Sequence, residues 1–198
     1  MPLLDIHTHN PAAMANGTAL VTAGIHPWEL TEANAEGALE HLLGLIVEKR
    51  ISAIGESGLD KLTQAPIWLQ TSVFERQVEW SEAYRLPLII HCVKATDELL
   101  DVRKRYRPLQ PWILHGFRGK PQQAEQLLRH GLYLSFGERF SEAALRLVPD
   151  ERLFVETDTS PLGIGEILER VASARGVEAE SLRETIRRNI RNVFQRGD

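Results

Sequence analysis

The sequence has a single cysteine, Cys92, among its 198 residues. One cysteine cannot form an internal disulfide, which agrees with a protein of a reducing compartment. No apolar run is long enough to span a bilayer, which argues against a transmembrane helix. The amino terminus also lacks the basic region and long apolar stretch of a signal peptide, so we expect a cytoplasmic protein.

Neither sign of charge dominates, because 23 lysines and arginines face 27 aspartates and glutamates. The sequence also lacks repeats and low-complexity tracts. The net charge of −4 does not indicate nucleic-acid binding by itself. It does not exclude such binding either, because a local basic patch or bound cations could offset it. The length suits one domain with a sizeable core, so we predict a single domain over residues 1–198.

The chain does contain a regular alternation of short apolar runs with longer helical patterns. The runs predict strands at 3–7, 19–25, 51–54, 88–90, 112–114, 132–136 and 153–155. The longer patterns predict helices at 39–47, 66–84, 97–106, 121–129, 166–174 and 180–194. This order predicts an α/β fold with about seven parallel strands and outer helices. A full eight-stranded barrel uses roughly 250 residues, so we expect a shortened TIM-type β/α barrel.

Residues that can bind metal follow these predicted strands. The set is His7, His9, Glu56, His91, His115 and Asp158. Side chains two apart on a strand share a face, so His7 and His9 can point at one centre. The active site of a β/α barrel gathers at the carboxyl ends of its strands. Four imidazoles and two carboxylates suit Zn, Mn or Mg, and their number suggests two divalent ions, which a carboxylate could bridge.

Each of these residues also has a plainer interpretation. A single histidine after a strand is usually a hydrogen-bonded loop residue, and a glutamate there is often solvated. Asp60 could orient a ligating histidine or cap a helix. Cys92 is better explained as a small buried residue than as a nucleophile. Only the joint pattern after five separate strands favours a metal site.

Six motifs in order resemble those of the TatD family of metal-dependent hydrolases. They are DIHTH at 5–9, GIHP at 24–27, IGESGLD at 54–60, LPLIIH at 86–91, HGF at 115–117 and ETD at 156–158. This family has a β/α-barrel fold related to the amidohydrolases, and it includes magnesium-dependent deoxyribonucleases. The resemblance implies that His7, His9 and Asp158 hold one metal and that His91 and His115 hold the other. Glu56 would bridge the two metals, and His26 would face the substrate or a phosphate group.

The sequence departs from the family pattern in ways that concern substrate recognition. The stretch between His9 and Gly24 is too short for a full βα unit, so a partner subunit could cover the gap in a homo-oligomer. Where the family often has an arginine, this chain has Val93 followed by Lys94, which could replace it as a point charge. Arg118, with the neighbouring Lys120, could hold a phosphate, although a solvated loop pair is the simpler explanation.

The predicted function is therefore a metal-dependent hydrolase with a dinuclear site that activates water. Asp158 would orient and deprotonate that water, and Glu56 would assist at the metals. The resemblance favours a phosphodiesterase, specifically a deoxyribonuclease acting on DNA ends or nucleotides. Two alternatives stay open: an amide or ester hydrolase of the amidohydrolase type, and a non-enzymatic remnant of the family.

Overall fold

The computed structural model describes residues 3–194, and its internal contacts divide the chain into two compact units. Unit 1 contains the residues up to Leu20 and those from Ile113 onward. Unit 2 contains the segment from Val21 to Trp112. Among the described helices, none is long and apolar enough to cross a membrane.

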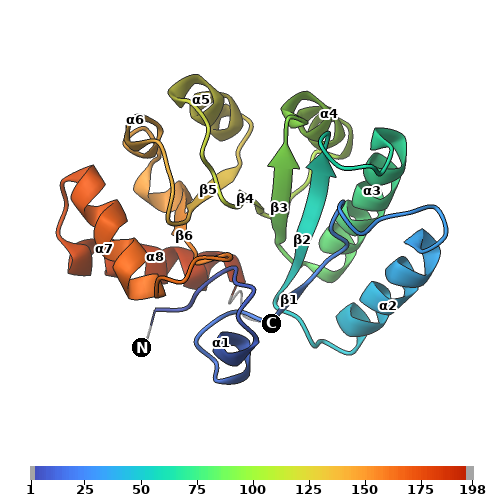
Figure 1. Ribbon diagram of the computed structural model, residues 1–198, viewed down its shortest axis with the longest axis horizontal. Coiled ribbons are helices and arrows are strands. Elements are labelled where there is room, and N and C mark those ends of the chain that lie inside the picture. Colours follow the sequence, from blue (N-terminus) through green and yellow to red (C-terminus); the bar gives the residue numbers. More distant parts are fainter. Residues whose placement is uncertain (1–2, 195–198) are drawn as a thin grey trace. The chain divides into compact units, whose positions relative to one another are not determined.

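Unit 2 is built from three parallel strands with a helix after each. The strands are β1 (Thr22–Ala23), β2 (Ala53–Asp60) and β3 (Leu88–Val93), which pair in that order. The helices are α2 (Ala35–Val47), α3 (Ile67–Tyr84) and α4 (Thr96–Tyr106). Figure 1 shows these helices along one side of the strands, where α3 contacts β2 and α4 contacts both β2 and β3. The apolar faces of α3 and α4 are thereby buried against the sheet, and α2 packs on α3.

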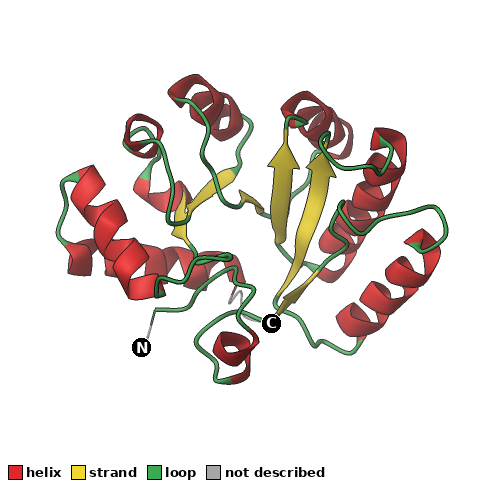
Figure 2. Cartoon of the chain, viewed as in Figure 1, coloured by secondary structure: helices red, strands yellow, loops and turns green. Residues whose placement is uncertain are grey.

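Unit 1 repeats this plan with shorter strands. Its strands are β4 (Trp112–Leu114), β5 (Tyr133–Phe136) and β6 (Leu153–Val155), paired in parallel. The first residue of β4, Trp112, is counted with unit 2. Its helices are α1 (Pro11–Ala15), α5 (Pro121–Arg129), α6 (Glu142–Leu145), the 3₁₀ turn η1 (Asp150–Arg152), α7 (Ile164–Arg175) and α8 (Ala179–Phe194). The alternation of strand and helix is visible in Figure 2. The predicted α/β class with parallel strands is confirmed.

The first predicted strand, at 3–7, differs from the expectation. This segment forms no strand: Asp5 bridges Ala19, and Thr8, just after it, bridges Asp158. The described strands therefore number six instead of about seven. Between the bridges, the chain turns through the short helix α1, which the sequence analysis did not predict. The stretch that looked too short for a βα unit thus holds one helical turn, after which Leu20 donates its amide hydrogen to the Asp5 carbonyl.

Strand β2 is longer than predicted, and its backbone closely approaches the neighbouring strand β3. It continues from Ala53 to Asp60, so Glu56 lies within the strand and not after it. Gly58 has φ +145°, and a Cβ atom there would lie 2.0 Å from the carbonyl oxygen of His91. Only glycine fits this conformation and this close approach. The glycine therefore sets the distance between β2 and the histidine of β3.

We expect the Gly58→Ala variant to unfold more easily than the wild type. The strained φ alone costs about 1–3 kcal/mol, and the contact with the His91 carbonyl adds to it. Gly44→Ala in α2 is the matched control, because its added methyl group would meet open space in a helix. That control should stabilise the protein by about 0.5–1 kcal/mol. Urea unfolding of the three proteins measures both effects, and equal midpoints for Gly58→Ala and wild type would contradict the prediction.

Candidate metal centre

Unit 1 brings together four of the six predicted metal ligands. Ligand atoms of His7, His115 and Asp158 all lie within 4.8 Å of one another. Nε2 of His9 lies 3.5 Å from Oδ1 of Asp158, and Nε2 of His7 lies 3.8 Å from the same oxygen. The rings of His7 and His115 are 4.5 Å apart. This is a mixed nitrogen and oxygen set suited to a divalent cation.

Backbone pairing fixes the position of Asp158 against the two N-terminal histidines. The Asp158 amide donates to the His7 carbonyl at 3.0 Å, and the His9 amide donates to the Asp158 carbonyl at 3.0 Å. Asp158 itself has φ +52°, a left-handed conformation that aspartate tolerates better than most residues. The two histidines and the carboxylate are therefore held by the main chain and not by side-chain contacts alone.

Asp5 reinforces this arrangement through hydrogen bonds to residues beside the ligands. Its carboxylate accepts the amide hydrogens of His7 and Thr157, each at 3.2 Å, and the Thr157 hydroxyl at 2.5 Å. Burial raises the pKa of Asp5 to about 6, although the hydrogen bonds from Thr157 oppose that shift. Asp5 thus ties the strand-like segment of His7 to the end of β6.

Glu156 is the residue of this group that the sequence analysis missed. Its side chain is fully buried, and Oε1 lies 3.2 Å from Nδ1 of His115 and accepts the Gly116 amide hydrogen at 2.6 Å. Burial raises the pKa of Glu156, but the charge and hydrogen bond of His115 outweigh it and hold the pKa below its ordinary value. With Nδ1 engaged, His115 presents Nε2 to a metal, the arrangement that carboxylates enforce on ligating histidines. The sequence signal was its place in the ETD motif, directly after β6 and two residues before Asp158.

Unit 2 holds a second group of imidazoles and a carboxylate. Ligand atoms of His26, Glu56 and His91 lie within 4.8 Å of one another. Oε1 of Glu56 is 2.7 Å from Nδ1 of His91 and 3.1 Å from Nε2 of His26. Because the Trp28 amide donates to Nδ1 of His26, that ring directs Nε2 to the carboxylate. His26, predicted to face substrate, is thus part of a candidate ligand group.

Asp60 supports His91 as Glu156 supports His115. Oδ2 of Asp60 lies 3.1 Å from Nε2 of His91, which leaves Nδ1 for the group. Burial raises the pKa of Asp60, but hydrogen bonds from Trp28 and Leu62 and the contact with His91 hold it below its ordinary value. Asp60 ends β2 and caps no helix, so the geometry favours the orienting role that the sequence left open.

Two buried glutamines of helix α3 bind the main chain beside this second group, at Asp60 and at the residue before His26. Gln70 accepts the Asp60 amide hydrogen at 2.7 Å and donates to the Asp60 carbonyl at 2.9 Å. Gln77, two helical turns later, accepts the amide hydrogen of Ile25, the residue before His26, at 2.8 Å. Neither glutamine was singled out in the sequence, where both lie within an amphipathic pattern. Their spacing of seven residues puts them on one face of the helix.

The predicted substrate-binding cations lie beyond the strand ends. Lys94 and Arg118 are both exposed, each three residues after a candidate ligand, His91 and His115. Their contact with substrate remains a prediction. Cys92 lies beside His91, and burial raises the pKa of its thiol to about 11, which disfavours a nucleophilic role at neutral pH.

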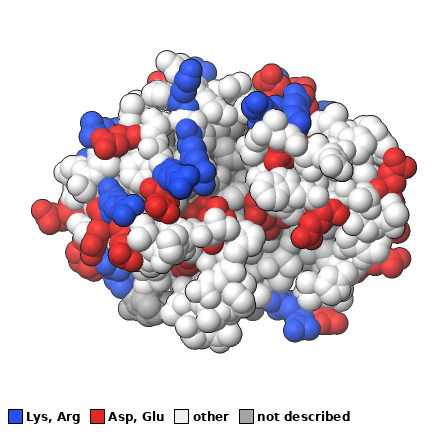
Figure 3. Space-filling view, viewed as in Figure 1, with Lys and Arg blue, Asp and Glu red and all other residues white. Residues whose placement is uncertain are grey.

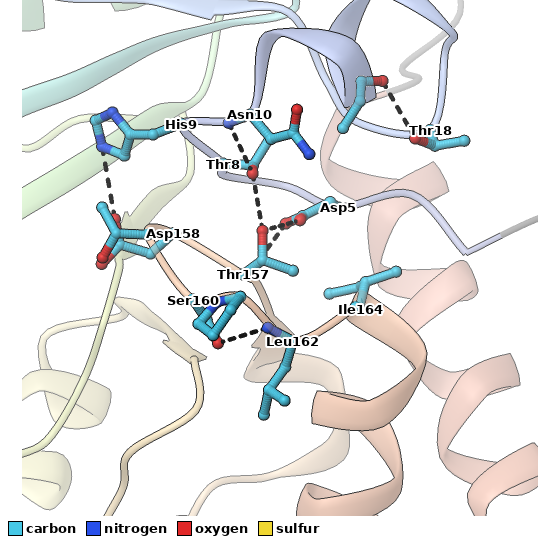
Figure 4. A pocket seen from close by; sticks show the side chains of 14 residues that line it. Asp5, Thr8, His9, Asn10, Thr18, Thr157, Asp158, Ser160, Leu162 and Ile164 are labelled. Atoms are coloured by element: carbon cyan, nitrogen blue, oxygen red, sulfur yellow. Dashed lines mark hydrogen bonds and ion pairs between the residues drawn. The ribbon is translucent and has the colours of Figure 1, made fainter.

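A polar pocket of about 600 Å³ opens beside His9 and Asp158 in unit 1 (Figure 4). Hydroxyl groups of Thr8, Thr18 and Ser160 line it, and the start of α7 closes one side. Its lining includes carboxylates but no lysine or arginine. Such a lining offers hydrogen-bond donors and acceptors to a polar ligand beside Asp158.

Comparisons with known proteins identify the family of this chain. A sequence model of the family described as TatD related DNase matches residues 6–195. The chain belongs to the TatD-related DNase family. The predicted family and the predicted hydrolase class are thereby confirmed.

Relatives within the family carry nuclease names. The "3'-5' ssDNA/RNA exonuclease TatD" of Cronobacter sakazakii is 30% identical over 207 residues, covering 87% of this chain and 76% of that protein. The human "3'-5' RNA nuclease TATDN2" is 35% identical over 148 residues, covering 68% of this chain but 19% of that protein. The crystal structure of YJJV, a TatD homolog from Escherichia coli, has a TM-score of 0.81 at 23% identity, covering 98% of this chain and 85% of that one. This similarity confirms a TatD-type fold.

We expect Glu156→Gln to bind divalent metal about 10–100-fold more weakly than wild type, because it removes the charge that orients His115. Calorimetric titration of Mn²⁺ into metal-free protein measures the affinity. Glu180→Gln, an exposed member of an ion pair with Arg183, is the control and should bind like wild type. A Glu156→Gln protein with native circular dichroism and wild-type affinity would refute the orienting role.

Cys92 should react slowly with a thiol reagent in the folded protein. With a pKa of about 11, its thiolate fraction at pH 8 is about 100-fold below that of an unfolded cysteine. The rate of reaction with Ellman's reagent, with and without 6 M guanidinium as the chosen denaturant, tests this. Equal rates in both conditions would show that the thiol is accessible and activated.

Proposed function

We propose that this chain is a metal-dependent phosphodiesterase that acts on the ends of DNA or of single-stranded nucleic acid. The observation that carries the proposal is the pair of ligand groups, one in each unit, each with two imidazoles and a carboxylate within 4.8 Å. The nuclease names of the relatives support the choice of a phosphodiester substrate.

The residues of both groups fit divalent cations, because their ligand atoms are of suitable chemistry and buried carboxylates orient their histidines. In unit 1, His7, His115 and Asp158 would hold one ion, with His9 beside Asp158. In unit 2, Glu56 and His91, with His26 beside them, would hold a second. Each group contains one histidine whose remote nitrogen meets a buried carboxylate, Glu156 or Asp60, as ligating histidines require. The predicted bridge through Glu56 and the pairing of His91 with His115 remain predictions.

A divalent cation held by these residues would act as a Lewis acid and lower the pKa of a bound water molecule toward neutrality. Asp158 is the residue proposed to orient the attacking water and accept its proton. Its side chain is partly exposed, so solvent and substrate can reach it, and its backbone is fixed between His7 and His9. Glu56 would contribute negative charge that keeps the neighbouring imidazoles oriented.

The surface charge favours short or single-stranded substrates. On the face shown in Figure 3, lysine and arginine side chains are interspersed with acidic ones instead of forming one basic field. Long duplex binding relies on many phosphate contacts. Lys94 and Arg118, exposed three residues after a candidate ligand each, would contact single phosphates.

We expect the wild type to shorten 5′-labelled single-stranded DNA in the presence of Mg²⁺, Mn²⁺ or Zn²⁺. Asp158→Asn should lower the rate by at least about 100-fold, since it removes the proton acceptor and a ligand charge. Asp101→Asn, an exposed position in α4, should cleave like wild type.

Denaturing gels over time measure these rates, with EDTA as the metal-free control. Wild-type protein that cleaves carbonyl esters or amides but no phosphodiester would replace the proposal with the amidohydrolase alternative. Cleavage unchanged in Asp158→Asn would instead remove Asp158 from the reaction.

A further inference from the structure

Unit 2 exposes a large aromatic ring directly beside its candidate metal group. Trp28 follows His26 by two residues, and 66% of its surface is exposed. The indole ring lies 5.1 Å from the ring of His26 and 5.9 Å from that of His91. Exposed tryptophan sacrifices favourable burial, so its position at a functional group suggests that a ligand covers it.

The ring is exposed but not free to rotate. Its Nε1–H donates to Oδ2 of Asp60 at 2.7 Å, and it meets both imidazole rings nearly at right angles, at 88° and 81°. A side chain held in this way loses little conformational entropy when it binds a partner. The ring is therefore already oriented for a planar ligand.

The other carboxylate oxygen of Asp60 accepts a backbone hydrogen bond from a second residue with an exposed apolar side chain, Leu62. The Leu62 amide donates to Oδ1 of Asp60 at 2.7 Å, and the Leu62 residue is 65% exposed. One carboxylate thus anchors the indole of Trp28 and the backbone of Leu62. We call these two exposed residues the Trp28/Leu62 platform.

We propose that the Trp28/Leu62 platform stacks a nucleobase of the substrate next to the His26, Glu56 and His91 group. The inference rests on the proposed phosphodiesterase function and adds a recognition element to it. Bases stack on aromatic side chains with little regard to sequence, and the base must first be unpaired. Stacking here would therefore favour single-stranded ends and tolerate any base, without any need for a basic surface.

The structure also offers a simpler role for Trp28, namely holding Asp60 in place for His91. Two substitutions separate these roles. Trp28→Ala removes both the ring and the Nε1–H donor, whereas Trp28→Phe keeps an aromatic ring and removes only the donor. Trp68→Ala is the matched control, because Trp68 is 59% exposed in the same unit and is outside the platform.

The experiment measures KM and kcat of each protein on a 5′-labelled single-stranded oligothymidylate. We expect Trp28→Ala to raise KM about 10–100-fold, the range that stacking of one base supplies. Trp28→Phe should stay within about threefold of wild type, in keeping with a retained stacking ring. Trp68→Ala should match the wild type. Impairment of Trp28→Phe equal to that of Trp28→Ala, or a Trp28→Ala protein with unchanged KM, would overturn the proposal.

A binding comparison tests the base directly. In the Asp158→Asn background, we would measure the affinity for oligothymidylate and for an abasic oligomer of the same length and charge. The protein with Trp28 should prefer the oligomer with bases, and Trp28→Ala should remove most of that preference. Retained preference in Trp28→Ala would place the base elsewhere. A wild type that neither binds nor cleaves any oligonucleotide would refute the proposed function itself, whatever the variants do.

Discussion

The candidate site depends on one constraint, which is that a buried carboxylate must be compensated by hydrogen bonds or by a neighbouring imidazole. Glu156 and Asp60 are both buried. Glu156, directly after β6, is paired with His115 after β4, and Asp60, at the end of β2, is paired with His91 of β3. An unpaired carboxylate in such a place would be costly, so each acid and imidazole hold one another in a single orientation. The ring nitrogen that remains is the one available to a metal. The same requirement positions Asp5, whose three hydrogen bonds join the segment of His7 to the end of β6.

The helices contribute to the site through polar groups as well as through their apolar faces. Helix α3 inserts Gln70 and Gln77 into the unit 2 core, where they bind the main chain beside Asp60 and before His26. A glutamine side chain offers a donor and an acceptor, so it can satisfy both main-chain groups of one residue. These bonds fix the end of β2 and the loop just before His26. The glutamines of α3, which are not ligands themselves, therefore help to hold the ligand group in place.

The short connection after His9 shows how little chain is needed to keep the unit 1 group intact. One turn of helix, α1, returns the chain so that Ala19 bridges Asp5, and Thr8 bridges Asp158. These main-chain contacts align His7 and Asp158 without a complete strand. The substrate surface is a different matter, because it is built from loops such as those of Trp28 and Leu62, whose composition is free to vary around fixed ligands.

The sequence by itself determined the α/β class, the six longer helices, most of the strands, and the set of residues with metal-binding chemistry. These follow from local periodicity and from motifs in order, which are properties of short segments. Only the tertiary structure decided the partners: that His26 joins Glu56 and His91, that Glu156 and Asp60 stand behind histidines, and that Gln70 and Gln77 hold main chain. It also decided that residues 3–7 form bridges instead of a strand and that β2 runs on to Asp60. Such contacts join residues far apart in the chain, so their energy depends on packing and burial, which no local pattern encodes.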